Sequence, residues 1–294
     1  MRVFRAIDHL SGCAVLADSA ADRDPARLYD PGVATRDERR AQLTDVYREA
    51  RGCPRCPELA RTRTQVVFGA GNADADLMFV GEAPGAKEDE QGIPFVGAAG
   101  KLLDQLLGEV GLTRSDVFIA NVLKCRPPGN RDPLPMEIEN CSVYLMRQVE
   151  LIAPRVICTL GNFSTKLLRG DPTGISRLHG QAEILVIGAR AVRLYPLFHP
   201  AAALYTRSLL ETLQADFARL PALLALAPPE QPEPATLPEP AVPEPGLAAS
   251  DPGPTPPEPQ AELEPAPGAE PTPVPDPEPV PEPGAPDERQ LGLF

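Results

Sequence analysis

The amino-acid sequence predicts an α/β sandwich with a mainly parallel sheet. Short apolar runs that suit buried strands alternate along the chain with longer segments whose apolar residues recur at helical spacing. Glycine and proline residues separate the two kinds of segment. Strands that alternate with helices of this length form parallel sheets, and such folds place their functional sites beyond the carboxyl ends of the strands.

The elements follow one another in a regular order. Helical spacing of apolar residues predicts five helices: Asp37–Arg51, Ala98–Val110, Met136–Ile152, Phe163–Leu168 and Leu209–Leu220. Short apolar runs predict five strands: Leu77–Val80, Val117–Val122, Val156–Leu160, Ile184–Ile187 and Val192–Leu197. Residues 1–36 show no period and form an N-terminal extension of uncertain structure. The remaining length suits one domain with a sizeable core, residues 37–221.

The C-terminal segment has a different composition. Residues 228–294 hold 23 of the 38 prolines, 14 of the 41 acidic residues and one of the 28 basic residues. So few apolar side chains cannot offset the entropy of ordering the chain, and we expect residues 222–289 to be a disordered linker. The net charge of −13 therefore belongs to the tail. Residues 1–227 carry 27 charges of each sign, which is compatible with nucleic-acid binding.

Targeting signals are weak in this sequence. No run approaches the roughly 18 apolar residues of a membrane span. LSGC at the start looks like a lipoprotein cleavage site, but Arg5, Asp8 and His9 interrupt the segment before it. We therefore expect a cytoplasmic, monomeric protein without a membrane partner, whose cysteines are reduced thiols or metal ligands.

Four cysteines form a candidate metal site. Cys53 and Cys56 are a C-x-x-C pair, and Cys125 and Cys141 follow with 15 residues between them. Four thiolates can hold an iron–sulfur cluster or a zinc ion. Zinc modules usually bring two tight pairs and this chain brings one, so the spacing favours iron–sulfur without excluding zinc. Cys158, in the apolar run VICTL, reads as a buried thiol.

Polar motifs follow three of the predicted strands. GEAPG follows the first, NVLKCRPPGNR the second and FHP the last. The glycines of FVGEAPGAKEDEQGIPFVGAAG let the backbone approach a ligand, yet neither GxGxxG nor GxxxxGK[ST] is present. Phe95, an aromatic residue in this polar loop, is either a core anchor or a stacking platform.

Taken together, these motifs resemble those of family-4 uracil-DNA glycosylases, the iron–sulfur type. The resemblance rests on GEAPGxxED with GxPFVG, NVLKCRPPGNRDP, the C-x-x-C pair, the later Cys141 and FHPA, in this order from about Leu43 to Leu220. It implies a three-layer α/β/α sandwich. It also implies a [4Fe–4S] cluster on Cys53, Cys56, Cys125 and Cys141.

The resemblance further implies an enzyme that releases uracil from DNA and so starts base-excision repair. A uracil must be flipped out of the duplex into a pocket that reads its edge. Phe95 would stack on the ring, and Asn121 would pair with O4 and N3–H, which the reversed pattern of cytosine cannot satisfy. His199 would donate a hydrogen bond to O2, where negative charge develops as the glycosidic bond breaks.

Three further residues complete the implied pocket. Glu82 and the main chain of Ala83 would line it, and Glu88 lies where a bulkier group in other families blocks the methyl group of thymine. We expect Glu82 to position or activate the water nucleophile. A dissociative reaction path would need little help from a base, so this role predicts only a modest loss in Glu82→Gln.

DNA contacts are predicted from loop positions. Lys124, Arg126 and Arg131 surround the CRPPGNR loop and could hold phosphates. Leu204 or Tyr205, in the loop after His199, could wedge into the gap left by the flipped base.

The last residues, QLGLF, resemble the peptide with which proteins bind the bacterial sliding clamp. Gln290, Leu291, Leu293 and Phe294 would be its anchors, docking in an apolar groove. The residues from Pro228 to Arg289 would span on the order of 50 to 190 Å. Such a tether would keep the enzyme near the clamp.

Two other functions compete with this reading. The chain could be a superfamily member with another damaged-base preference, or one that traps its product covalently, although residues 125–141 lack the histidine of such relatives. It could also be an inactive iron–sulfur DNA-binding protein or clamp adaptor. Phe95, Asn121 and His199 together argue against mere binding.

Overall fold

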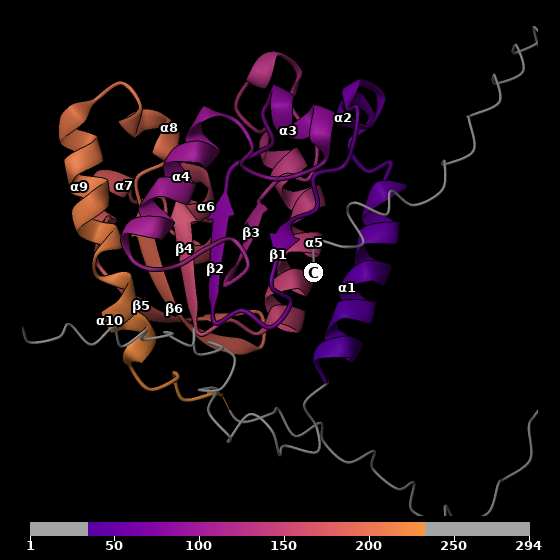
Figure 1. The fold of residues 1–294 in the computed structure, drawn as a ribbon. Helices are drawn as coiled ribbons and strands as arrows, with labels where there is room; N and C mark the ends of the chain where they lie inside the picture. Colours follow the sequence, from indigo (N-terminus) through magenta and orange to yellow (C-terminus); the bar gives the residue numbers. More distant parts are fainter. Residues whose placement is uncertain (1–34, 233–294) are drawn as a thin grey trace, which may run out of the picture.

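The computed structural model describes residues 35–232, which form a mixed sheet between two layers of helices (Figure 1). The six strands are ordered β1-β3-β2-β4-β6-β5. Their bounds are β1 Ala70–Gly71, β2 Leu77–Gly81, β3 Val117–Asn121, β4 Val156–Leu160, β5 Glu183–Ile187 and β6 Arg190–Leu197. The four central strands are parallel, and the edge strands β1 and β5 are antiparallel to their neighbours. The predicted α/β class and mainly parallel sheet are confirmed.

Ten α-helices lie within the described residues. They are α1 Arg36–Arg51, α2 Pro57–Thr62, α3 Ala86–Gln91, α4 Ala98–Glu109, α5 Pro135–Ile152, α6 Asn162–Arg169, α7 Ile175–Leu178, α8 Pro200–Ala203, α9 Arg207–Phe217 and α10 Leu220–Ala225. A short 3₁₀ turn, η2, spans Pro128–Asn130. Thr35 caps α1 in a capping box with Glu38, which explains why the helix begins there.

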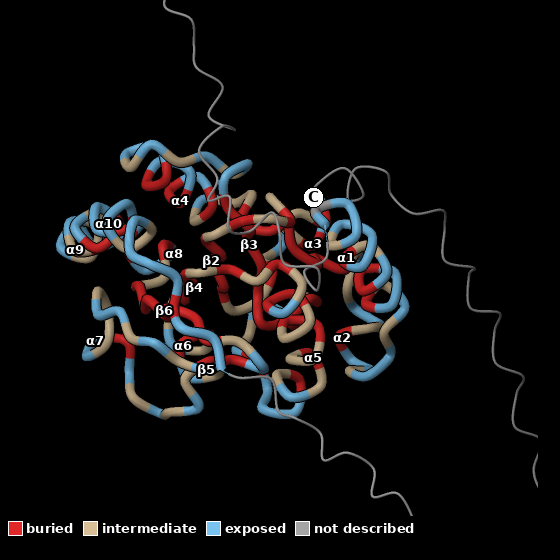
Figure 2. The backbone as a smooth tube through the Cα atoms, turned by 90° about the horizontal axis from the view of Figure 1, so that it is seen from below, coloured by how far each residue is buried: buried red, intermediate tan, exposed pale blue. Residues whose placement is uncertain are grey.

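Alternate residues of the central strands face opposite helix layers, as strand geometry requires. In β2, Met78 and Val80 belong to the core shared with α1, α5 and α6, whereas Leu77 and Phe79 belong to the core shared with α4, α9 and α10. All five residues of β2 are buried. Figure 2 shows the buried chain at the centre, with exposed chain on the outer helices. The sheet is therefore covered on both faces, and functional residues must lie at a strand end.

All five predicted strands and four of the five predicted helices agree with the structure within two residues at each end. The fifth predicted helix is instead two helices, α9 and α10, separated by two residues. Four short helices and β1 were not predicted, because two to six residues give no readable period.

The folded chain continues past the predicted boundary at residue 221. Helix α10 extends to Ala225, and the segment after it is held to the sheet by hydrogen bonds. Arg155 Nη2 donates to the Leu226 carbonyl at 2.6 Å, and the Gln231 side chain bonds both main-chain groups of Ala191. The folded part of the chain therefore extends at least to Gln231.

Several predictions concern residues outside the described part of the chain. These are the N-terminal extension up to residue 34, the linker from residue 233 onward and the terminal peptide Gln290–Phe294. Within residues 35–232, no helix combines the length and apolar character that a membrane span requires.

Candidate active site

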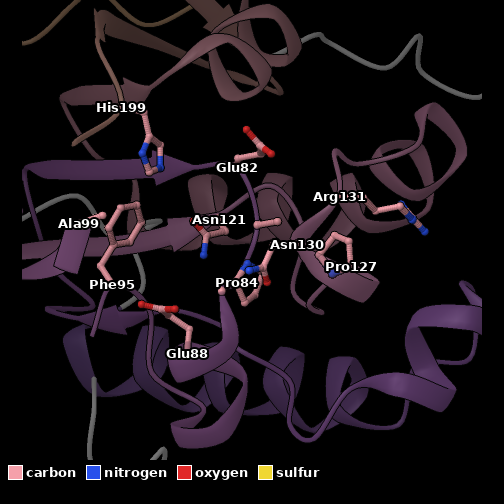
Figure 3. Close-up of a pocket in the computed structure, with 12 residues that line it drawn as sticks. Glu82, Pro84, Glu88, Phe95, Ala99, Asn121, Pro127, Asn130, Arg131 and His199 are labelled. Carbon is pink, nitrogen blue, oxygen red and sulfur yellow. The ribbon is translucent and has the colours of Figure 1, made fainter. Parts of the chain in front are cut away.

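A cavity of about 220 Å³ lies at the carboxyl ends of β2, β3 and β6 (Figure 3). It is the place where parallel strands of an α/β sheet present their ligands. The six residues predicted for the pocket all line this cavity: Glu82, Ala83, Glu88, Phe95, Asn121 and His199. They come from three separate parts of the chain, residues 82–95, 121 and 199, which the fold brings together.

Phe95 forms one wall of the cavity in a strained backbone conformation. Its φ is +55°, a region that costs a non-glycine residue about 1 kcal/mol or more. Arg114 donates to the carbonyls of both Pro94 and Phe95. Gly100 permits this arrangement, because an added Cβ would lie 1.7 Å from the Phe95 carbonyl oxygen. The ring is thereby held 5.7 Å from the His199 ring, with 27° between their planes.

Asn121, the last residue of β3, presents a buried amide to the cavity. Its side chain is 2% exposed, and Oδ1 has no hydrogen-bond partner among the described residues. A Cβ on the neighbouring Gly81 would lie 2.4 Å from Asn121 Oδ1 and 2.6 Å from the Phe95 ring. Glycine at position 81 thus lets the amide and the ring approach each other. A buried acceptor without a partner indicates a ligand that donates a hydrogen bond.

His199 faces Phe95 from the segment after β6. Its Nδ1 accepts a hydrogen bond from the Ala201 main-chain N–H at 3.1 Å, so it caps α8. Nδ1 must therefore be unprotonated, and in the neutral ring the proton lies on Nε2. Burial lowers the pKa of His199 to about 4. At pH 7 the ring is a neutral donor through Nε2.

Two carboxylates line the same cavity and differ in surroundings. Glu82 follows β2, and burial, with the Asp132 charge as a smaller cause, raises its pKa. Glu88 Oε1 accepts hydrogen bonds from the main-chain N–H groups of Val96 and Gly97, at 2.9 and 2.8 Å. Glu88 therefore also fixes the loop that carries Phe95. Glu82 is the carboxylate left free to act on a ligand or on water.

The rim of the cavity comes from the loop after β3. Pro127 and Asn130 line it and were not singled out from the sequence, although the CRPPGNR motif contains both. Arg131 lines it too, but its guanidinium is held by Glu137, at 2.7 and 2.9 Å, and by Glu58, at 2.8 Å. Its two acidic partners disfavour the predicted phosphate contact. The rim is fixed by ion pairs to α2 and α5.

The prediction that Lys124 contacts phosphates is wrong. Its side chain is 1% exposed, and Nζ donates to the Asn121 carbonyl at 2.8 Å and to Gln148 Oε1 at 2.6 Å. Burial lowers the pKa of Lys124 to about 8. The lysine points into the core, where Gln148 accepts its hydrogen bond and the Phe68 ring lies close to Nζ. Arg126 is half-buried, and its Nε donates to Oδ1 of the exposed Asn130 at 2.7 Å.

Leu204 and Tyr205 project beyond α8, near His199 in the chain. Leu204 is 39% exposed and Tyr205 92% exposed. Large apolar side chains at a loop tip cost solvation free energy unless a partner covers them. Their exposure suits the predicted wedge.

The four cysteines of the candidate metal site line one small cavity between α1, α2 and α5. Arg63 Nη1 and the Lys124 main-chain N–H donate to the sulfurs of Cys125 and Cys141, each at 3.2 Å. Burial raises the pKa of the Cys56 and Cys125 thiols and that of Cys141 to about 12. Within residues 35–232, no group of three or more His, Cys, Asp or Glu side chains has the geometry of a metal site.

The fold and the cavity define an α/β protein with a buried polar site at the carboxyl ends of its parallel strands. Comparison with known proteins agrees, since residues 68–221 match the uracil-DNA glycosylase superfamily. The chain is 47% identical to the type-4 uracil-DNA glycosylase of Archaeoglobus fulgidus over 182 residues, which cover 60% of this chain and 91% of that relative.

Two further relatives are similar over a comparable share of the chain. The type-4 uracil-DNA glycosylase of Sulfurisphaera tokodaii is 45% identical over 60% of this chain and 83% of its own length. That of Thermotoga maritima is 43% identical over 58% of this chain and 87% of its own length. This chain therefore belongs to the type-4 family of the uracil-DNA glycosylase superfamily.

Proposed function

We propose that this chain is a DNA glycosylase, a hydrolase that cuts the bond between uracil and deoxyribose in DNA and leaves an abasic site for repair. Family membership supports the reaction. The observation that carries the assignment to this cavity is the buried Asn121 amide with its unpaired Oδ1, beside the rings of Phe95 and His199.

The cavity suits a flipped uracil. Asn121 can accept from uracil N3–H through Oδ1 and donate to O4 through Nδ2, because an amide carries both functions in one plane. Phe95 offers a flat face on which the ring can stack. Cytosine presents the opposite pattern at N3 and N4, so its binding would leave buried groups unpaired.

His199 stabilises the leaving base. Breaking the glycosidic bond moves an electron pair onto uracil, and negative charge develops at O2. A neutral imidazole with its proton on Nε2 can donate there without losing a proton to the base. Such a donor contributes most when it is fixed in advance, as the hydrogen bond from Ala201 to Nδ1 supports.

Glu82 positions the water that attacks the sugar carbon, and this role predicts a pH dependence. Its folded-state pKa is raised, so the single-turnover rate should fall as the pH drops through a value above the ordinary 4.5 of glutamate. We expect Glu82→Gln to lose the acidic limb of the pH–rate profile and less than about 100-fold of the plateau rate. An unchanged acidic limb in the variant would assign it to another group. Circular dichroism at each pH checks that the protein stays folded.

The DNA duplex must open for uracil to reach the cavity. Leu204 and Tyr205 are suited to fill the gap in the base stack, since apolar wedges lower the cost of extruding a nucleotide. Arg126 is the remaining candidate phosphate contact in the CRPPGNR loop. We propose that the enzyme works on DNA in the cytoplasm as a monomer.

Membership of the type-4 family and the four cysteines that line one cavity support an iron–sulfur cluster. Cys53, Cys56, Cys125 and Cys141 offer four sulfurs, and the N–H donors and the Arg63 charge offset part of the effect of burial on their pKa values. Bound [4Fe–4S] would join the segment before α2 to the loop after β3 and to α5. It would supply structural cross-linking at this edge of the domain.

Purified protein should accordingly be brown, with broad absorption near 400 nm and about four irons per chain. Cys141→Ser should abolish the 400 nm absorption and the bound iron and lower the midpoint temperature of thermal unfolding. Cys158→Ser, at a buried cysteine outside the site, should leave the colour unchanged. One zinc per chain in a colourless protein would refute the cluster.

The terminal peptide QLGLF is proposed to bind the sliding clamp. The support is its sequence alone, a glutamine followed by a Leu-x-Leu-Phe anchor at a chain end. Deleting Gln290–Phe294 should abolish clamp binding in surface plasmon resonance, and excision from short oligonucleotides should keep its rate. A full-length Leu291→Ala/Phe294→Ala variant should lose clamp binding in the same way, which would assign the loss to these anchors and not to the shortened chain. Undiminished clamp affinity after truncation would exclude the peptide.

The proposed reaction is tested by single-turnover assays on oligonucleotides with one uracil opposite guanine or adenine. We expect release from both, and none above background from matched strands with thymine or hypoxanthine. Comparable release of hypoxanthine would favour a broader damaged-base preference.

A further inference from the structure

The Lys124 side chain connects the core of the protein to the residue that faces the ligand. Lysine is rarely buried unless its donors are satisfied, and here Nζ has two hydrogen-bond acceptors. One of them is the main-chain carbonyl of Asn121, three residues earlier. The other is Gln148 Oε1, on the buried face of α5. Nζ also lies 5.8 Å from the centre of the Phe68 ring.

These contacts lie on the β1 side of β3, past the end of its pairing with β1, whereas β2 still pairs with β3 as far as Asn121. Strand β1 pairs with β3 only at Phe118 and Ile119, so β3 runs on toward the cavity without β1 beside it. On that side, two side chains supply hydrogen bonds beside the main-chain bond from the Val67 N–H to the Lys124 carbonyl. Lys124 Nζ donates to the Asn121 carbonyl, and Gln148 Nε2 donates to the Phe68 carbonyl at 2.9 Å. Lys124 and Gln148 therefore supplement the main-chain hydrogen bonds on this side of the site.

Lys124 reaches Asn121 from a fixed backbone. Its main-chain N–H donates to Cys141 Sγ, and its carbonyl accepts from the Val67 N–H at 2.8 Å. The Asn121 side-chain amide is held less firmly, because its Oδ1 has no hydrogen-bond partner within the described residues. The direction of its amide thus depends on packing and on the peptide group that Lys124 holds.

We propose that Lys124 is a positioning residue for base recognition: through its bond to the Asn121 carbonyl, it orients the Asn121 amide toward the ligand. This inference rests on the proposed function of Asn121 in reading uracil. Misplacing a recognition group by about 1 Å costs up to roughly 100-fold in rate. A merely structural lysine would instead lower stability without a specific effect on recognition.

A double-mutant cycle separates the two roles. Single-turnover uracil excision is measured for wild type, Lys124→Met, Asn121→Ala and the double variant, all with their 400 nm absorption and thermal midpoint recorded. We expect Lys124→Met to lose about 10- to 100-fold in the wild-type background. In the Asn121→Ala background the same change should cost less than about twofold, since there is no amide left to orient.

The outcomes are distinct. Equal losses in both backgrounds, or no loss in the wild-type background, would overturn the positioning role. If Asn121→Ala itself excises uracil normally, the proposed reading of uracil by Asn121 fails, not this inference alone. Tyr195→Phe is the matched control, because it also removes a buried hydrogen bond to a main-chain carbonyl, that of Asp216, and should act equally in both backgrounds.

Should Lys124→Met not fold, Gln148→Met gives a second test. It removes the other acceptor of Nζ and leaves the lysine in place. A smaller loss is expected, again confined to the background that keeps Asn121. Additive losses for Gln148→Met would contradict the proposal in the same way.

Discussion

Replacing His199 with alanine should slow uracil excision on the order of 10³-fold at pH 7, which is the loss expected for a pre-positioned donor to a developing anion. The affinity for uracil-containing DNA should change little, because the charge on O2 develops only as the bond breaks. Single-turnover rates at saturating enzyme, with binding measured separately by fluorescence anisotropy, resolve the two effects.

His179 provides the matched control for this variant. It is the other histidine of the described residues, lies against Phe198 and pairs with Asp216 at 2.9 Å, away from the cavity lining. His179→Ala should reduce stability, because it leaves the buried Asp216 without this partner, but the rate of the folded enzyme should stay within severalfold. A His199→Ala enzyme of near wild-type rate would exclude His199 as the anion donor.

The pH dependence of wild type gives a further check on His199. With a pKa of about 4, the ring is neutral at every pH above about 5. The excision rate should therefore show no ionisation of imidazole between pH 6 and 8. An ionisation in that range that disappears in His199→Ala would mean that the ring is protonated near neutrality.

The second large effect is expected for Asn121→Asp. The change keeps the size of the side chain but turns the donor toward uracil O4 into a second acceptor. An ionised carboxylate facing O4 would repel the base and remain unpaired in a buried position, so we expect a loss of about 10³-fold or more in uracil excision.

Asn72→Asp is the same chemical change at a site remote from the cavity. Asn72 Oδ1 accepts from the Asp74 main-chain N–H at 2.9 Å, a bond that aspartate can also accept. Its rate should match wild type. Comparable activity of Asn121→Asp and Asn72→Asp would show that position 121 does not read the base.

Much of the fold and the cavity lining could be predicted from the sequence. Strands such as Leu77–Val80 are short apolar runs, and the motifs that follow them must meet at one edge of a parallel sheet. Glu82, Asn121 and His199 each lie at or just after the end of a strand, so a parallel sheet brings them to one edge. The strain at Phe95 was not visible, because it arises from Arg114 and from the close approach of Gly100.

The burial of Lys124 could not be predicted from the sequence. A lysine beside arginine and proline in a polar motif indicates an exposed loop, and its burial depends on Gln148 and Phe68, which lie far away in the sequence. The end of the domain was misplaced for a related reason. PALLALAPP leads directly into the proline-rich tail, and the hydrogen bonds of Arg155 and Gln231 that hold this segment are tertiary contacts.

The most direct test of uracil excision at this cavity is to identify the released base by mass spectrometry. One duplex carrying a single uracil among ordinary bases is incubated with excess wild-type enzyme or with His199→Ala. The account predicts free uracil and an intact abasic strand from wild type, no other base, and a roughly 10³-fold slower release from the variant. Folded, brown wild-type protein that releases no base, or equal release by both proteins, would contradict it.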